Sequence, residues 1–171
     1  PTVADDRPGY KLWPFVCGWL DTPTGRVPQI TTKLTSTDIF GRWQMRWGLG
    51  RNRYSIAPGL YAIGSPTADS QVLVTANYKM TFDIVRRNMH GHDLWLLVLD
   101  TKGVNVWCAA GKGTFGTDEM IRRVQINGLD QIVNHRILIV PQLVAPGVAS
   151  QKVSKACGFK VVFGPVRSND L

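Results

Sequence analysis

Residues 94–110 read LWLLVLDTKGVNVWCAA, in which an apolar hexapeptide is followed by a polar turn and a helix-forming segment. A continuous apolar run bounded by turn residues predicts a buried strand over Leu94–Leu99. Asp100–Gly103 supplies the turn, and Val104–Ala110 predicts a short helix. A single cysteine, Cys108, would therefore lie on a helix at the carboxyl end of a strand. In open α/β sheets, ligands bind at this edge, so the placement suggests a thiol presented to a ligand.

The same alternation of strands and helices continues on both sides of this segment. Strands are predicted over 71–76, 137–140 and 159–163, and helices over 81–89, over 150–157 and from Thr117 onward, with Thr117 as N-cap. Alternating β and α elements imply a parallel sheet with right-handed crossovers. The sequence thus predicts the α/β class: a Rossmann-like parallel sheet with flanking helices and a cap helix that carries Cys108.

The N-terminal part of the chain has a different pattern. Residues 1–28 are rich in Pro, Gly and Thr and predict an irregular arm. Residues 29–64 predict an extension made of an antiparallel β-hairpin unit, with extended segments at 29–34, 42–47 and 53–56 and a turn at 48–50. We therefore expect an arm (1–28) and one further domain (29–171), in which the β extension precedes a Rossmann-like unit at 71–171.

Composition limits the class of protein. A chain of 171 residues, 44% apolar and 19% charged, suits one soluble globular domain, and no stretch approaches the ~20 apolar residues of a membrane span. The chain starts at Pro1 and not at Met, so we interpret it as a fragment. The cysteines, Cys17, Cys108 and Cys157, form no C-x-x-C pair, so neither a zinc ribbon nor an iron–sulfur cluster can be built from them alone. An odd number of cysteines also suits a reducing compartment.

A basic cluster accompanies the net charge of +8. It comprises Arg42, Arg46, Arg51 and Arg53, interleaved with aromatic residues, a mixture that can bind nucleic acid. We interpret it instead as a solvated face beside core aromatics and expect no nucleic-acid partner. Contact with anionic lipid or with an acidic electron carrier is the other alternative.

Two motifs have simpler interpretations than the ones they first suggest. Residues 111–116 spell G-x-G-x-x-G, but they follow a short helix and not a strand, which favours a helix stop over a dinucleotide site. The segment His90–Asp93 could hold a metal, but its position at a helix end favours an ordinary turn. No Asp-x-His occurs, so the D-x-H-x-x-G motif, by which some cobalamin proteins supply an axial histidine, is absent. His135 precedes a buried strand, where a structural role is expected.

Four strand-end loops should meet at one edge of the sheet: residues 75–78, 100–103, 141–148 and 164–166. Small, apolar and hydrogen-bonding residues dominate them, so their backbone can approach a large flat ligand closely. Ordinary turn chemistry explains any one of these loops equally well. Their convergence makes a ligand site as good an interpretation as turn chemistry, and the residues suit a corrin ring, which is fringed with amides.

Residues 105–112, NVWCAAGK, resemble the cap-helix signature of the bacterial mercury-methylating corrinoid proteins, the HgcA family. The resemblance continues through residues 74–79, 100–103, 113–116, 135–136, 141–148 and 164–167, and covers nearly the whole chain beyond about Val27. A related family, the corrinoid iron–sulfur protein of acetyl-CoA synthesis, resembles the same scaffold but lacks the cysteine.

The resemblance implies a cobalamin cofactor whose own base is displaced, with the Cys108 thiolate as the lower axial ligand of cobalt. The implied activity is that of a methyltransferase, with cobalamin-dependent methyl transfer to Hg(II) giving methylmercury. The alternative is a corrinoid methyl carrier of one-carbon metabolism, in the acetyl-CoA pathway. The implied partners are a dicluster [4Fe–4S] ferredoxin, for reduction and mercury delivery, and a methyl donor protein or methyl-folate route. The family also carries membrane helices after this domain, which would place the full-length protein at the cytoplasmic face of the inner membrane.

The residues expected to contact the corrinoid lie on the cap helix and in the four strand-end loops. They are Thr75, Asn77, Tyr78, Asp100, Lys102, Gly103, Asn105, Val106, Trp107, Ala109, Ala110, Gly111, Lys112, Gly113, Thr114, Gln142, Leu143, Ala145, Pro146, Gly147, Val148, Gly164, Pro165 and Val166.

Overall fold

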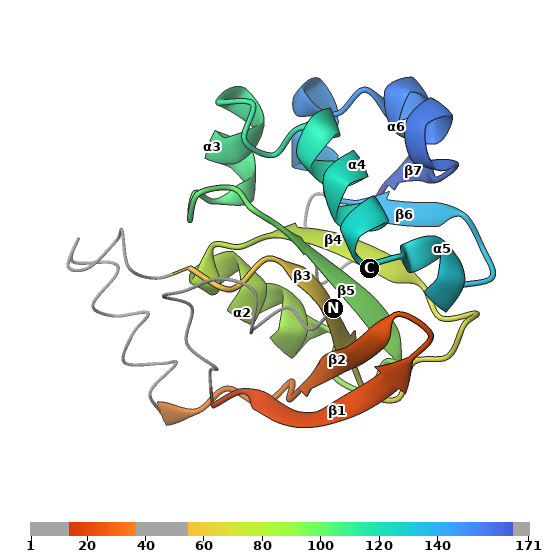
Figure 1. Cartoon of the computed structure of the whole chain (residues 1–171). Coiled ribbons are helices and arrows are strands. Elements are labelled where there is room, and N and C mark those ends of the chain that lie inside the picture. Colours follow the sequence, from red (N-terminus) through yellow and green to blue (C-terminus); the bar gives the residue numbers. More distant parts are fainter. Residues whose placement is uncertain (1–13, 37–54, 166–171) are drawn as a thin grey trace.

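The computed structural model describes residues 14–36 and 55–165 (Figure 1). Its strands are β1 (Val16–Thr22), β2 (Gly25–Ile30), β3 (Gly59–Ile63), β4 (Val72–Ala76), β5 (Leu94–Leu99), β6 (Ile137–Val140) and β7 (Lys160–Phe163). Its helices are α2 (Lys79–Asn88), α3 (Val106–Gly111), α4 (Thr117–Ile126), α5 (Leu129–Ile132), α6 (Ser150–Cys157) and the 3-10 helix η2 (Gln142–Gly147). The strand predicted at 42–47, the turn at 48–50 and the basic cluster lie outside the described residues.

Within the described part, the strands form a single seven-stranded sheet in the order β1-β2-β3-β5-β4-β6-β7. The strands β5, β4, β6 and β7 are parallel to one another, which confirms the Rossmann-like α/β half of the prediction. The remainder is mixed, because β3 runs antiparallel to β5 and β1 runs antiparallel to β2. From β4 the chain crosses to β5 on one side and later to β6 on the other. The strand order therefore reverses between β4 and β6, the kind of point at which α/β sheets bind ligands.

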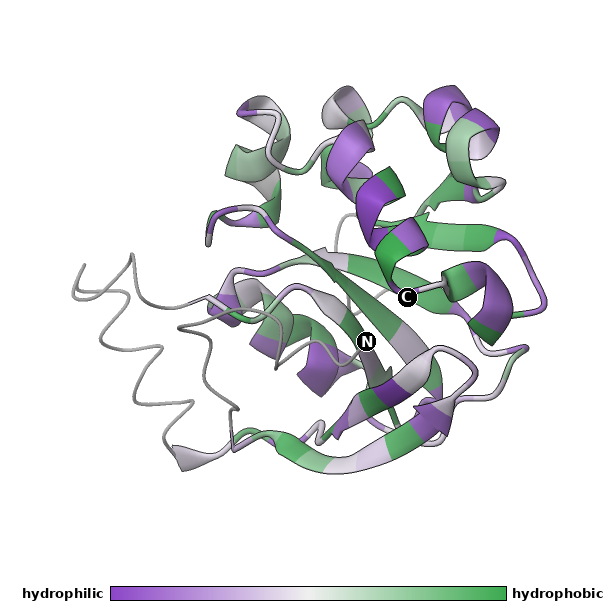
Figure 2. Cartoon of the chain, viewed as in Figure 1, coloured by the Kyte–Doolittle hydropathy of each residue, from purple (hydrophilic) through white to green (hydrophobic). Residues whose placement is uncertain are grey.

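Helices cover both faces of the central strands. Alternate residues of β4, such as Val72 and Val74, pack with Met120 of α4 and Val153 of α6. The intervening Leu73 packs on the opposite face with Phe82 of α2. Figure 2 accordingly shows apolar residues along the middle of the sheet and hydrophilic ones on the outer sides of the helices. Burial on both faces explains why these strands are continuous apolar runs without alternation.

The predicted elements of residues 71–163 are confirmed with small shifts at their ends. Strand β5 and helix α6 span the predicted residues, whereas α2 starts two residues before the predicted Thr81. Thr117 as N-cap of its helix is wrong: Gly116 occupies that position, and Thr117 is the first helical residue. The Thr117 hydroxyl instead accepts a hydrogen bond of 2.9 Å from the backbone N–H of Ala149, just before α6.

The irregular arm predicted for residues 1–28 is wrong for its described part. Strands β1 and β2 form an antiparallel hairpin in which Thr22 pairs with Gly25, and Gly25 has a positive φ of 123°. The hairpin is held to the sheet because Val27 and Ile30 are buried in the core and β2 pairs with β3. Pairing with a strand far along the chain gives these residues a structure that their Pro- and Gly-rich composition does not reveal.

Strand β3 and helix α5 were not predicted from the sequence, and η2 replaces a predicted loop. Strand β3 has the sequence GLYAI and is buried throughout, so it has no polar alternation. It is also short and stands between Pro58 and Gly64, two residues that usually mark turns. Its pairing with β5 from Gly59–Val98 to Ile63–Leu94 places it next to the central parallel strands.

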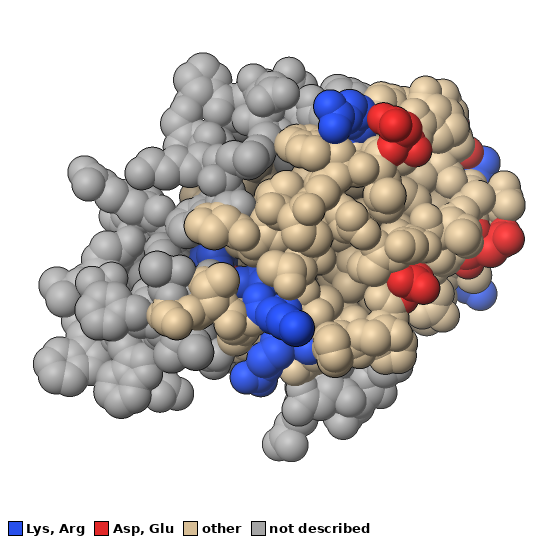
Figure 3. Space-filling model, turned by 90° about the horizontal axis from the view of Figure 1, so that it is seen from below, with Lys and Arg blue, Asp and Glu red and all other residues tan. Residues whose placement is uncertain are grey.

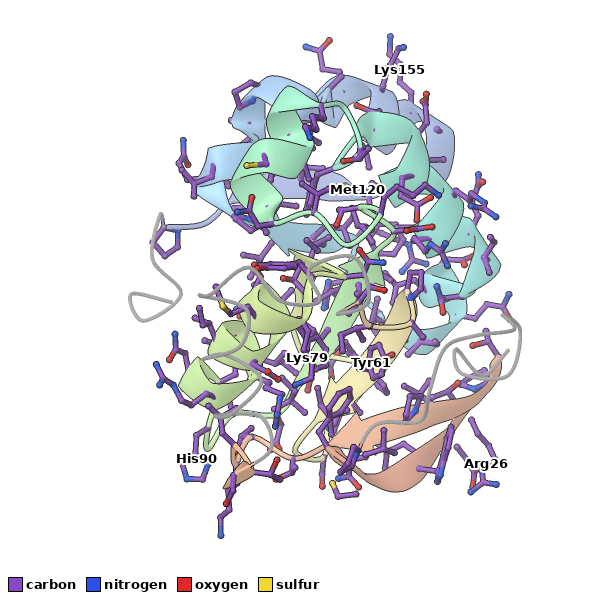
Figure 4. All side chains as sticks on the ribbon, turned by 90° about the vertical axis from the view of Figure 1, so that its left-hand side faces the viewer. Arg26, Tyr61, Lys79, His90, Met120 and Lys155 are labelled. Carbon is purple, nitrogen blue, oxygen red and sulfur yellow. The ribbon has the colours of Figure 1, made fainter. Side chains whose placement is uncertain are left out.

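A buried ionic network joins the N-terminal hairpin to α2. The Lys79 ammonium lies 2.5 Å from one Asp83 oxygen and the Arg86 guanidinium 2.8 Å from the other, and these side chains have no exposed surface. Arg86 also donates to the backbone carbonyls of Thr31 and Lys33, which follow β2, and both cations lie over the ring of Phe15. Figure 4 shows Lys79 in the interior, between α2 and the sheet.

On the face shown in Figure 3, Lys and Arg side chains gather in small groups between large uncharged areas. None of the described helices is both long enough and apolar enough to cross a membrane.

Candidate functional site at the carboxyl edge of the sheet

The structure brings the four predicted loops to one edge of the sheet. Strands β4, β5, β6 and β7 are parallel, so their carboxyl ends lie on the same side and lead into residues 77–78, 100–105, 141–148 and 164–165. Helix α3 follows β5 at this edge and packs through Val106, Ala109 and Ala110 on the core cluster that also contains Ala76 and Leu99. The edge therefore combines the reversal of strand order with a short helix above it (Figure 1).

Asn77 is the buried centre of the edge. Its side-chain oxygen accepts hydrogen bonds from the backbone N–H of Thr101 (3.0 Å), the Thr101 hydroxyl (2.9 Å) and the backbone N–H of Gly103 (3.0 Å). Its amide nitrogen donates to Asp100 over 3.3 Å. Its backbone N–H donates to Leu99, and its carbonyl accepts from Ile56. Asn77 thus connects the end of β4 to the turn that follows β5.

That turn has an unusual backbone conformation. Lys102 has a φ of +57° and Gly103 one of +69°, and Lys102 is the only non-glycine residue with positive φ among those the structure describes. Left-handed backbone is unfavourable for a residue with a Cβ and persists where surrounding contacts enforce it. Asp100 provides such contacts, because its carboxylate accepts from the Lys102 backbone N–H and from the Lys102 ammonium, each over 3.1 Å.

Helix α4 ties the turn from its other side. The Glu119 carboxylate accepts from the backbone N–H of Asp100 over 2.9 Å and from Arg123 over 2.5 Å. Arg123 is buried and also donates to the carbonyl of Pro58, immediately before β3. The turn is thus held between β4 and α4.

The cap helix presents Cys108 to solvent. Asn105 is the N-cap of α3, and its side-chain oxygen accepts from the backbone N–H of Cys108 over 2.8 Å, which holds the start of the helix. Cys108 itself is a free, exposed thiol. The helix ends within the Gly-rich segment as predicted, with Lys112 as C-cap and Gly113 at a φ of +72°.

The 3-10 helix η2 packs closely against the end of α3. A Cβ added to Gly147 would lie 2.8 Å from the carbonyl oxygen of Phe115 and 3.2 Å from that of Ala110. Val144 of η2 is buried, whereas Leu143 is 38% exposed and Gln142, Ala145 and Pro146 are exposed around it. The segment therefore packs against the C-terminal end of α3 and adds apolar side chains to the surface beside it.

The predicted site residues fall into three groups by exposure. The exposed ones are Lys102, Cys108, Gly111, Lys112, Gly113, Gln142, Leu143, Ala145 and Pro146. The half-buried ones are Tyr78, Gly103, Asn105, Thr114, Gly147, Gly164 and Pro165. The buried ones are Thr75, Asn77, Asp100, Val106, Ala109, Ala110 and Val148. The Trp107 side chain and Val166 lie outside the description. The buried group holds the edge in shape, and its side chains offer little or no surface to a ligand.

Residues that sequence reasoning omitted also shape the site. Thr101 and Glu119 hold the turn, and Phe115 forms part of the contact with Gly147. The role of Thr101 could have been predicted from its place in the strand-end turn. Nothing in the sequence indicates that the Glu119 carboxylate contacts Asp100, directly after β5. That contact depends on how α4 crosses the sheet.

Two of the described histidines, His90 and His135, have structural partners. His135 accepts from the backbone N–H of Ile137 and contacts the carbonyl of Ser70 over 2.9 Å, in line with its predicted structural role. His90 contacts the hydroxyl of Thr32 over 2.9 Å. In the described residues, no group of three or more His, Cys, Asp and Glu side chains is arranged to hold a metal ion.

The chain is thus an α/β domain whose strand order reverses at the carboxyl edge, where sheets of this kind bind ligands. A short helix that carries the exposed Cys108 lies at this edge. Residues 50–171 match the family model described as the CO dehydrogenase/acetyl-CoA synthase delta subunit, and the chain belongs to this family.

Curated relatives agree with this assignment. The gamma subunit of the acetyl-CoA decarbonylase/synthase complex is 32% identical over 123 residues in Methanopyrus kandleri and 37% identical over 127 residues in Methanosarcina acetivorans. Each match covers 71% of this chain and 26% of the relative, so the chain spans about a quarter of the length of these relatives. Their names refer to acetyl-CoA decarbonylase/synthase and not to mercury methylation. The comparisons therefore favour the acetyl-CoA alternative over the mercury-methylating resemblance.

Proposed function

We propose that this domain binds a corrinoid at the edge between α3, the 100–103 turn and η2, and that it serves as a methyl carrier. Membership of the acetyl-CoA synthase family supports the methyl-carrier class. The observation that carries the proposal is the position of Cys108, an exposed thiol on the cap helix above the reversal of strand order.

The residues present fit a corrinoid in two respects. The exposed residues near Cys108 in the sequence and on η2 include small ones, Gly111, Gly113 and Ala145, which let a broad flat ring approach. A single sulfur cannot hold a metal ion on its own, so a metal here needs further ligands of the kind that a macrocycle brings with it.

The chain's own residues would then have defined roles. Cys108 would lose its proton and coordinate cobalt as a thiolate, the form in which cysteine binds metals. Asn105 would hold the start of α3, and the exposed Lys102 and Lys112 are available as hydrogen-bond donors to the amides or phosphate of the cofactor. When bound, a corrinoid supplies a cobalt centre that accepts and donates a methyl group.

The test is reconstitution of the purified domain with cobalamin, followed by absorption spectroscopy. We expect a base-off corrinoid spectrum with cobalt–sulfur ligation, lost in Cys108→Ala but retained in Cys17→Ala, the matched change at another exposed cysteine. An unchanged spectrum in Cys108→Ala would exclude Cys108 as the lower ligand. Absence of binding by the wild-type domain would overturn the proposal as a whole.

A second candidate function is methyl transfer to Hg(II), and the presence of Cys108 favours it. The related corrinoid iron–sulfur protein lacks this cysteine, whereas the motif at residues 105–112 resembles that of the mercury-methylating proteins. A thiolate is a stronger electron donor than an imidazole and favours transfer of a methyl group as a carbanion equivalent, the form that electrophilic Hg(II) accepts. In this version, a dicluster [4Fe–4S] ferredoxin and a separate methyl donor complete the system.

A methylmercury assay on the full-length protein with its reductant separates the two acceptors. Formation of methylmercury by the wild type and its loss in Cys108→Ala would support Hg(II) as substrate. Cys108→His should bind the corrin and transfer the methyl group to mercury poorly. If the wild type forms no methylmercury yet methylates an acetyl-CoA synthase, the first candidate alone remains.

A further inference from the structure

The turn between β5 and α3 is held by a residue that directly follows another strand, β4. Asn77, which follows β4, is fully buried, and its one side-chain oxygen accepts from Thr101 N–H, Thr101 hydroxyl and Gly103 N–H at 2.9–3.0 Å. Two backbone N–H groups can reach one acceptor here because Lys102, between them, adopts the left-handed conformation. The amide oxygen therefore replaces the partners that these N–H groups would otherwise need.

From this turn, hydrogen bonds lead directly to the cap helix. The Thr101 carbonyl accepts from the backbone N–H of Val104, and the single proton of the Thr101 hydroxyl is shared between the Asn77 side-chain oxygen at 2.9 Å and the Val104 carbonyl at 2.7 Å. The next residue is the N-cap Asn105, whose side chain accepts from Cys108 N–H and whose carbonyl accepts from Ala109 N–H over 2.8 Å. Since α3 has only six residues, its position depends on such end contacts more than on its own length.

We propose that Asn77 is a positioning residue, which fixes the left-handed 101–103 turn and through it the place where α3 presents the Cys108 thiol. Asn77 was expected from the sequence to touch the cofactor, but its side chain has no exposed surface and is occupied by the turn. The use of the thiol as a cobalt ligand rests on the proposed function above. The positioning of α3 by Asn77 does not depend on that function.

Amide hydrogen exchange on the cofactor-free domain tests that link. We expect Asn77→Ala to accelerate exchange at least about tenfold at Thr101 and Gly103, the direct partners, and also at Cys108 and Ala109 in α3. Exchange at Leu96 and Leu97, in the middle of β5, should be unchanged. Asn127→Ala is the matched control, because it removes another buried Asn, whose side chain donates to the Arg123 carbonyl within α4. It should leave α3 unaffected.

A gentler pair of variants keeps the proposal testable if Asn77→Ala does not fold. Thr101→Val removes the hydroxyl that contacts Asn77 and Val104 but keeps the shape of the side chain, and Thr101→Ser restores the hydroxyl. We expect roughly fivefold faster exchange in α3 for Thr101→Val, the effect of about one lost hydrogen bond, and rescue by Thr101→Ser. Acceleration confined to the turn, with α3 unchanged, would overturn the proposal.

The cofactor-bound domain gives a second readout. In Asn77→Ala we expect the cobalt–sulfur spectrum to weaken at saturating cobalamin, although Cys108 is intact. A wild-type spectrum in this variant would contradict the positioning role. If the wild type binds no cobalamin at all, the proposed function fails, and the exchange experiment still decides whether Asn77 positions α3.

Discussion

Gly147 of η2 lies against Ala110 of α3 so closely that a Cβ on Gly147 would be 3.3 Å from the Cα of Ala110. The two residues belong to short helices that follow different strands, β6 and β5. Their contact fixes the C-terminal end of the cap helix, while the turn around Asn77 fixes its start. Cys108 is therefore held between two anchors that come from neighbouring strand ends.

The first prediction concerns this contact. Gly147→Ala should lower the free energy of unfolding by about 1–3 kcal/mol, because the new methyl group meets backbone atoms that cannot move independently. Gly111→Ala is the matched control: nothing lies within 4 Å of the added Cβ, and alanine favours a helix, so stability should be unchanged or slightly higher. Urea denaturation of both variants checks this. Equal stability of the two would show that η2 and α3 do not meet as described.

A second prediction concerns the N-cap of α3. Asn105→Ala should remove the bond to the Cys108 N–H and cost about 1 kcal/mol in local stability, because the helix has few other bonds at its start. Asn105→Asp should restore the cap. Amide exchange at Cys108 measures the effect, with faster exchange in the alanine variant only. Slow exchange in Asn105→Ala would mean that the N-cap is dispensable.

The buried ionic network provides a third prediction. Asp83→Asn should lower the free energy of unfolding by about 3–5 kcal/mol, because Lys79 and Arg86 then remain buried beside a neutral amide. Asp21→Asn should change it by less than about 1 kcal/mol, since the Asp21–Arg26 pair is exposed and 3.8 Å apart. Thermal melting of both variants compares them. Similar melting temperatures would contradict the burial of the network.

The fourth prediction concerns thiol reactivity. Burial raises the pKa of Cys157, with a hydrogen bond from the Phe159 backbone acting weakly in the opposite direction. A raised pKa leaves less thiolate at a given pH, so Cys157 should react with iodoacetamide more slowly than the exposed Cys108, and its rate should keep rising to higher pH. Mass spectrometry of alkylated peptides between about pH 7 and 10 measures the rates. In denaturant the difference should disappear. Equal rates in the folded domain would contradict the partial burial of Cys157.

The central elements were predictable because the pattern of apolar residues reflects burial directly. Leu94–Leu99 lies between helix-covered faces, so every residue is apolar, and this run alone indicates a buried strand. The helix over 150–157 follows from its periodicity. The N-terminal hairpin and β3 could not be predicted in this way, because their place in the sheet depends on pairing with distant residues such as Val98.

The candidate site was predictable in outline and not in its details. Parallel strands have their carboxyl ends on one side, so the convergence of the loops follows from the order of elements in the chain. Which loop residues reach solvent does not follow. Asn77 follows β4 as Tyr78 does, yet it is buried, because the turn after β5 and Ile56 hydrogen-bond to it. Thr75 is buried as well, because it still belongs to β4 and pairs with Val98 of β5.

Local sequence is therefore sufficient for the α/β class, for the helix that bears Cys108 and for the Asn105 cap, since each depends on residues a few positions apart. The orientation of that helix has another origin. It follows from three contacts: Asn77 holds the turn, Glu119 accepts from Asp100 after β5, and Gly147 meets Ala110. The partners in these contacts are 19 to 37 positions apart in the sequence. Such contacts exist only after the strands have paired and the crossovers have packed, because the free energy of close packing and of buried hydrogen bonds depends on three-dimensional neighbours and not on neighbours along the chain.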